Sequence, residues 1–190
     1  MEKLQIGFAK SEITPRIAMR LGGYRLRKSD FEGVHDDLFA CCAVLKNPQE
    51  SLALISLDLI GIDEQTNQNI IEAVHQATGI SRNKIFISST HTHSGPDTIF
   101  LGGQDEKIRH YCSELPEKVA KAAGSALSNL MDVEKVSLSR RIVEDVSFNR
   151  RLVMSDGSVE LNVNEVPEED ILSQGPTDPS SKHNPCHGTC

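Results

Sequence analysis

The stretch Leu52-Ala-Leu-Ile-Ser-Leu-Asp-Leu-Ile-Gly-Ile62 is the longest apolar run in the chain, and it decides the fold. The run is about half as long as a membrane-spanning helix needs and has Asp58 in its middle, so we expect a buried β-strand. A helical pattern follows over residues 63–79 and ends at Gly79. Lys84-Ile-Phe-Ile-Ser-Ser89 has the composition of a second strand. Strand, helix and strand in this order predict a βαβ unit, whose two strands are parallel and end at one edge of the sheet.

Further elements are predicted on both sides of this unit. Residues 4–13 alternate loosely, as a strand does, and residues 38–45 form a second apolar run. The polar segment 46–51 joins that run to the strand at 52–59, which predicts an antiparallel hairpin. Apolar residues recur on one face of a helix over 106–130. The expected fold class is therefore α/β, with a mixed sheet that contains the βαβ unit and two main helices that flank it.

The C-terminal part of the chain follows a different pattern. Residues 133–147 resemble a strand, and residues 151–161 predict a hairpin with Asp156-Gly157 as its turn. From Glu165 onward the sequence is rich in Pro, Ser, Asp and Glu and has little apolar periodicity. We therefore expect one domain over residues 1–164 and a poorly ordered tail over residues 165–190.

Composition excludes several classes of function. The chain has 190 residues, with 27 acidic against 20 basic side chains and a formal net charge of -7, so its overall field repels a nucleic-acid backbone. Aromatic residues make up only 4%, and Trp is absent, which leaves few platforms for stacking bases. We expect no nucleic-acid partner and no transmembrane segment. The N-terminus shows no secretory signal pattern and the five Cys show no disulfide framework, which predicts a cytoplasmic protein with reduced thiols.

The strongest chemical motif is Ser88-Ser-Thr-His-Thr-His-Ser-Gly-Pro96, directly after the second strand of the βαβ unit. Residues two apart in an extended backbone point to the same side, so His91 and His93 can face one site. Imidazole nitrogens bind Zn²⁺, and a catalytic zinc takes three protein ligands and a water, so two His cannot be the full set. Asp58 could fix the tautomer of a metal-bound imidazole or cap the following helix. The alternative interpretation of the motif is a His pair that caps loop carbonyls.

Several segments resemble, in order, motifs of the neutral/alkaline non-lysosomal ceramidase family. The most specific is THTHSGP within SSTHTHSGPD (88–97). The others are GFAKSEITP (7–15), GGY (22–24), GVHDDLFA (33–40), LDLIG (57–61), FNRR (148–151) and GPTDP (175–179). The resemblance implies a zinc amidase that hydrolyses the N-acyl bond of ceramide to sphingosine and a fatty acid, with a zinc-bound water as nucleophile.

The resemblance also implies roles for individual residues. His91 matches a zinc ligand, and His93 matches a residue beside it, which we expect to be catalytic through proton transfer. Asn149 and Arg150 match a segment that lines the substrate pocket, where Arg150 is a candidate for holding an oxyanion or a polar head group. A solvated position on a hairpin is the alternative for Arg150. The expected substrate is a lipid or a small amide, and residues 22–24 resemble a loop near the site.

The chain also departs from the family pattern. A second His ligand and the Ser, Glu and Tyr of the family site are not recognisable in this sequence. We therefore expect a truncated, incomplete catalytic domain that is inactive alone and holds zinc poorly. An alternative for the tail is a small metal site formed by His183, Cys186, His187 and Cys190.

Two other functions compete with the amidase. A different metal-dependent amidohydrolase would place an H-x-H motif on an eight-stranded barrel, but such barrels typically need about 250 residues. A non-catalytic binding or partner protein would keep the sheet and lack the chemistry. Tightly bound zinc would favour an enzyme over the non-catalytic protein.

Overall fold

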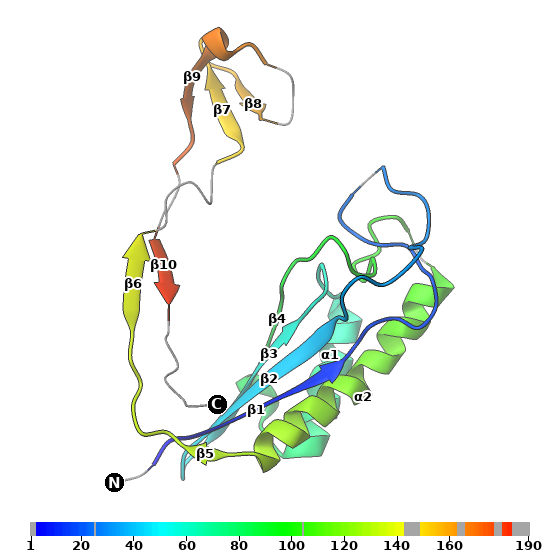
Figure 1. The fold of residues 1–190 in the computed structure, drawn as a ribbon, viewed down its shortest axis with the longest axis vertical. Helices are drawn as coiled ribbons and strands as arrows, with labels where there is room; N and C mark the ends of the chain where they lie inside the picture. Colours follow the sequence, from blue (N-terminus) through cyan, green and yellow to red (C-terminus); the bar gives the residue numbers. More distant parts are fainter. Residues whose placement is uncertain are drawn as a thin grey trace. The chain divides into compact units, whose positions relative to one another are not determined.

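The computed structural model describes residues 3–24, 26–103, 105–142, 149–162, 166–176 and 180–183. The chain divides into two compact units, Met1–Val133 and Glu134–Cys190, which are coloured along the sequence in Figure 1. The predicted division into a domain over residues 1–164 and a poorly ordered tail over residues 165–190 stays a prediction.

The first unit is built on a five-stranded mixed sheet. Its strands are β1 (Gln5–Glu12), β2 (Phe39–Lys46), β3 (Ser51–Leu57), β4 (Ile85–Ser89) and β5 (Met131–Asp132). They lie in the order β4-β3-β2-β1-β5. β2 and β3 form the predicted antiparallel hairpin, and β3 and β4 pair in parallel, which confirms the βαβ unit. The α/β fold class with a mixed sheet is therefore confirmed.

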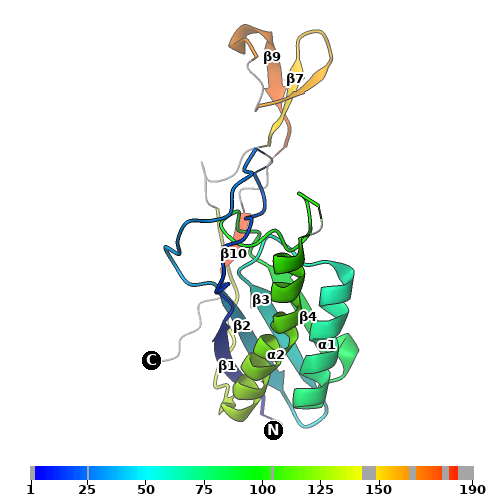
Figure 2. The ribbon, with the colours of Figure 1, turned by 90° about the vertical axis from the view of Figure 1, so that its right-hand side faces the viewer.

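Two helices cover the same face of this sheet (Figure 2). Helix α1 (Glu64–Thr78) begins after Asp63, whose carboxylate accepts a hydrogen bond from the Thr66 amide, and ends at Gly79, which has a positive φ of 72°. A short 3₁₀ helix, η1 (Arg82–Lys84), leads into β4. Helix α2 (Glu106–Ser128) continues through Pro116 without a break. Asp and Gly at the two ends of α1 are the residue types that the helix termini require.

The core of the first unit lies between the helices and the sheet. Helix α2 contributes a fully buried apolar stripe that includes Ile108, Leu115 and Val119. Gly7 in β1 faces this helix so closely that an added Cβ would lie 2.0 Å from the Ala126 carbonyl oxygen. The helix therefore packs directly on the backbone of β1.

The opposite face of the sheet carries a row of apolar side chains. Phe8, Ala43, Leu54 and Phe86 are cross-strand neighbours on β1 to β4. Phe8, Leu54 and Phe86 are each about half exposed and line an open apolar groove. The two faces of the sheet thus have similar residue types but different degrees of burial.

The second unit contains short strands. β7 (Arg151–Met154) and β8 (Val159–Leu161) form the predicted hairpin around Asp156-Gly157, and β9 (Ile171–Gln174) adds to the other side of β7. β6 (Ser139–Ile142) pairs with β10 (Ser180–His183). Residues 143–147 of the predicted strand lie outside the described residues.

Strand β9 and the 3₁₀ turn η2 (Glu168–Asp170) fall within the segment for which we expected poor order. Backbone hydrogen bonds to β7 hold β9, while its Leu172 is 72% exposed. A strand that buries so little shows no apolar periodicity, so the sequence pattern missed it. In the part of the chain that the structure describes, no helix is long and apolar enough to cross a lipid bilayer.

Candidate active site

The H-x-H motif lies in the loop that follows β4, at the edge where the parallel strands β3 and β4 end. The Thr90 amide donates to the Leu57 carbonyl at 2.9 Å, and the His91 amide donates to the Leu59 carbonyl at 3.0 Å. These bonds continue the β3–β4 pairing beyond the strands. The motif is therefore held at the edge of an α/β sheet where ligands commonly bind.

His91 has one ring nitrogen anchored and the other available. Its Nδ1 lies 2.7 Å from the Ile60 carbonyl oxygen. A carbonyl can only accept, so Nδ1 carries the proton of the hydrogen bond, and in the neutral ring the lone pair is then on Nε2. His91 itself is exposed. An imidazole fixed through Nδ1 in this way has the arrangement that metal-binding His residues usually show.

The rings of His91 and His93 lie together, with centroids 5.2 Å apart and planes inclined at 70°. The sequence predicts that an extended backbone turns both rings to the same side. In the structure, however, the strand ends at Ser89 and His91 has a φ of 61°. A left-handed residue between the strand and the loop, rather than strand alternation, sets the direction of the two rings. Such a conformation is uncommon for residues other than glycine and is often found at functional sites.

His93 is partly buried beneath a segment from the long loop between β1 and β2. The Tyr24 ring meets the His93 ring edge-on, with centroids 5.0 Å apart. Arg27 Nη1 donates to the His93 carbonyl at 2.9 Å, and its guanidinium lies 4.9 Å from the Tyr24 ring centroid. Gly23 has a φ of 94°, and a Cβ there would lie 2.2 Å from His93 Cγ. The GGY segment therefore packs against the site.

Sequence reasoning noted this GGY segment only through its resemblance to a family loop and missed Arg27. Two adjacent glycines in a long loop are a signal of close backbone approach. Arg27 offers no such signal, because its bond is to a main-chain carbonyl 66 residues away.

Asp58 has neither of the two roles considered for it. Its Oδ2 accepts a hydrogen bond from the Phe39 amide at 3.0 Å, which joins the end of β3 to the start of β2. Asp63 caps α1, and the Ile60 carbonyl is the partner of His91. A backbone carbonyl thus takes the place that we considered for a carboxylate.

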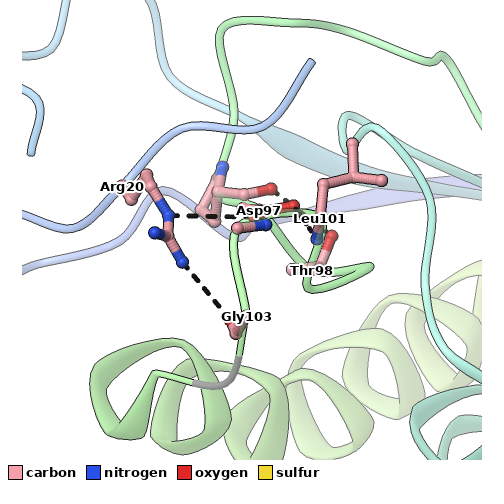
Figure 3. Close-up of polar contacts among 7 residues, drawn as sticks. Arg20, Asp97, Thr98, Leu101 and Gly103 are labelled. Carbon is pink, nitrogen blue, oxygen red and sulfur yellow. Dashed lines mark hydrogen bonds and ion pairs between the residues drawn. The ribbon is translucent and has the colours of Figure 1, made fainter. Parts of the chain in front are cut away.

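The loop beyond His93 contains two buried polar residues. Thr98 is fully buried, and its Oγ1 donates to the Gly61 carbonyl. Asp97 is 2% exposed and its carboxylate faces the guanidinium of Arg20 (Figure 3). These two side chains tie the loop to the end of β3 and to the β1–β2 loop.

Asn149 and Arg150 belong to the second unit, and their predicted substrate contacts stay predictions. Asn149 Nδ2 donates to the Pro176 carbonyl at 3.1 Å, and its Oδ1 accepts from the Arg151 amide at 2.9 Å. Both polar atoms of this side chain thus join the start of β7 to the segment after β9. Arg150 is exposed.

No group of three or more His, Cys, Asp or Glu side chains that could hold a metal ion occurs among the described residues. The structure therefore brings His91 and His93 together without a third such ligand from the ranges that it covers. The hypothesis of a metal site in the tail concerns Cys186, His187 and Cys190, which lie outside the described residues. The side chain of His183 is not described either.

Comparison with known proteins agrees with this fold. A family model described as neutral/alkaline non-lysosomal ceramidase, N-terminal, matches residues 4–152. The neutral ceramidase from Pseudomonas aeruginosa is similar with a TM-score of 0.67 and 19% identity, and a ceramidase complexed with C2 with a TM-score of 0.65 and 20% identity. Both similarities cover 79% of this chain and 25% of the other, so the chain spans about a quarter of the length of these ceramidases. From the family match over most of its length, the chain belongs to the neutral/alkaline non-lysosomal ceramidase family.

Proposed function

We propose that this chain forms the N-terminal part of a zinc-dependent amidase site that hydrolyses the N-acyl bond of ceramide to sphingosine and a fatty acid. The observation that supports the proposal is the hydrogen bond between His91 Nδ1 and the Ile60 carbonyl, because it leaves the lone pair of the neutral ring on Nε2. Family membership supports the choice of reaction and of a lipid substrate.

His91 would hold the zinc ion through Nε2. A bound zinc ion supplies a Lewis acid for the amide carbonyl and a water whose pKa is about 7. His93 lies beside His91, and no described residue forms a hydrogen bond with its ring nitrogens. We propose that His93 takes up a proton from the attacking water and returns it to the leaving amine.

The described residues provide too few ligands for tight binding. A catalytic zinc normally has three protein ligands, and His91 is the single ligand that we assign here. We propose that the remaining ligands come from outside the described residues and that the 190-residue chain alone binds zinc weakly and lacks turnover. The contribution of Asn149 and Arg150 to substrate binding is part of the same proposal.

A chimera tests the reaction. Residues 4–152 replace the matching segment of the Pseudomonas aeruginosa neutral ceramidase, and ceramide hydrolysis and bound zinc are measured together. His91→Ala should abolish both. His75→Ala is the matched control, because His75 Nδ1 also bonds to a carbonyl, that of Ile80, but on helix α1. A folded chimera in which the His91→Ala variant keeps its zinc and its turnover would refute the proposal.

The isolated chain tests the incomplete site. We expect it to lose its zinc on dialysis and to leave ceramide intact. One tightly held equivalent of zinc with turnover would show that the chain carries a complete site. Absence of any zinc interaction at His91 would instead favour a non-catalytic binding protein.

A further inference from the structure

We propose that Arg20 and Asp97 are positioning residues for His93, acting through the segment Arg20–Tyr24, which we call the strap. The proposal rests on the proposed function for its catalytic meaning, since His93 is there the proton-transfer group. Its geometric content depends only on the described residues. Three sets of contacts link Asp97 to the His93 ring.

The strap runs along the loop that contains His93. The Asp97 amide donates to the Arg20 carbonyl at 3.1 Å, and the Gly22 amide donates to the Gly95 carbonyl at 3.0 Å. Leu21 and Pro96 form an isolated antiparallel bridge between these two bonds. Two segments far apart in sequence are thereby paired over three residues.

An ion pair between the buried carboxylate of Asp97 and the partly exposed side chain of Arg20 anchors one end of the strap (Figure 3). Asp97 Oδ1 and Oδ2 accept hydrogen bonds from the amides of Leu101 and Gly102, at 3.1 and 2.8 Å. Arg20 Nε lies 3.8 Å from Asp97 Oδ2, and Arg20 Nη2 donates to the Gly103 carbonyl at 3.3 Å. Because Nε is buried and has no hydrogen-bond partner among the described residues, the charge of Asp97 is the interaction that compensates for its burial.

Glycine at position 102 leaves room for this pair. A Cβ on Gly102 would lie 2.3 Å from the central guanidinium carbon of Arg20. The guanidinium is thus enclosed between the Asp97 carboxylate and a backbone that bears no side chain. An ion pair with a carboxylate that is only 2% exposed is screened less by water than a pair on the open surface, so it fixes the strap more firmly.

The other end of the strap touches His93. Gly23 lies against the His93 ring so closely that an added Cβ would overlap it, and the Tyr24 ring meets the same imidazole edge-on. Movement of the strap therefore moves the surface that holds the ring. A displacement of about 1 Å in a catalytic group can reduce turnover on the order of a hundredfold.

Nuclear Overhauser spectroscopy of the labelled 190-residue chain tests this inference without zinc or substrate. The chain has two Tyr, and Tyr111 is buried in the core, so the Tyr24 ring signals can be assigned. The unmodified chain should show cross-peaks from the His93 ring to the Tyr24 ring and to the Gly23 Hα. Their absence would overturn the proposal at the outset.

Substitutions then separate positioning from stability. Arg20→Met and Asp97→Asn should each remove these cross-peaks, whereas Arg20→Lys, which keeps the positive charge, should retain them. Arg82→Met is the matched control, because it breaks an ion pair with Glu72 elsewhere in the first unit. Cross-peaks that persist in Arg20→Met and Asp97→Asn would show that the pair only stabilises the loop.

If both charge variants fail to fold, Gly23→Ala decides the question, because its new Cβ should displace the ring directly. Retained Tyr24–His93 cross-peaks in a folded Gly23→Ala chain would also refute the proposal.

In the ceramidase chimera, Arg20→Met should lower kcat by about 10–100-fold with KM nearly unchanged. An inactive parent chimera would count against the proposed function, while the cross-peaks would still report on the strap.

Discussion

The helix-covered face of the five-stranded sheet and the loop layer at its carboxyl edge are stabilised in different ways. Apolar burial dominates the first, where Leu115 and Ile70 have no exposed surface. The loop layer instead depends on the buried polar residues Asp97 and Thr98 and on close approach at Gly23. Changes in the core should therefore alter the free energy of unfolding, whereas changes in the loop layer should alter the geometry of His91 and His93.

The largest expected effect is on the helix-covered face. Leu115→Ala should lower the free energy of unfolding by about 2–5 kcal/mol, because it removes a fully buried side chain and leaves a cavity in a close-packed core. Denaturant unfolding measures the change. Leu26→Ala is the matched control, since Leu26 is 90% exposed in the β1–β2 loop and should change stability by less than about 0.5 kcal/mol. Equal effects at the two sites would contradict the assigned core.

Cys41 and Cys42 are adjacent in β2 and lie on opposite faces of the sheet, so their reactivities report on the two faces. Cys42 is buried on the helix side, and this burial, with a smaller contribution from the neighbouring Cys41 thiol, raises the pKa of Cys42 to about 11. At pH 8 its thiolate fraction should be on the order of one in a thousand, because each pKa unit is a factor of ten. Alkylation followed by peptide sequencing in a mass spectrometer should find Cys41 modified first, since Cys41 is exposed. Equal labelling of both residues in the folded chain would contradict the assigned orientation of β2.

Gly7, which packs against helix α2, and Gly124, which lies within it, differ in the space that surrounds their Cα atoms. Gly7→Ala should destabilise the chain by about 1–3 kcal/mol, because its Cβ would overlap the Ala126 carbonyl. Gly124→Ala, within α2 and with open space around its Cα, should instead stabilise it by about 0.5–1 kcal/mol. Thermal unfolding of the two variants gives the sign directly. A neutral Gly7→Ala would show that α2 lies farther from β1.

The smallest expected effect comes from a solvated ion pair outside both regions. Hydrogen bonds from Arg82 and Gln76 lower the pKa of Glu72 below its ordinary value. Its contribution to stability is therefore present at neutral pH and is lost as the pH falls through the folded-state pKa. Glu72→Gln should slightly reduce stability at pH 7 and have no effect at a pH where Glu72 is protonated. A difference that grows as the pH falls would contradict this sign.

Much of the first unit could be predicted from periodicity and end signals. The apolar runs gave β2, β3 and β4, and Asp63 and Gly79 marked the ends of α1 because these residue types satisfy helix termini. Strand β9 could not be predicted, because its backbone pairs with β7 while its side chains bury little surface. Local sequence pattern therefore identifies elements that bury an apolar face and misses those that do not.

The site was predictable only in part, for a related reason. The H-x-H motif indicated the loop that carries the candidate ligand, and the βαβ unit placed that loop at the carboxyl edge of the sheet. The left-handed conformation of His91, its bond to the Ile60 carbonyl and the contact of Arg27 with His93 depend on residues distant in sequence. Polar contacts between single atoms of distant residues produce no periodic pattern in the sequence.

The central claim is that His91 presents Nε2 to a metal ion because the Ile60 carbonyl fixes the proton on Nδ1. Long-range ¹H–¹⁵N spectra of the imidazole rings test it most directly, recorded at a pH where the ring is neutral and then with added zinc. We predict the Nδ1–H tautomer for His91 and a zinc-dependent shift of its Nε2 that exceeds any shift at His75. An Nε2–H tautomer for His91, or zinc shifts that leave its Nε2 unchanged, would contradict the account.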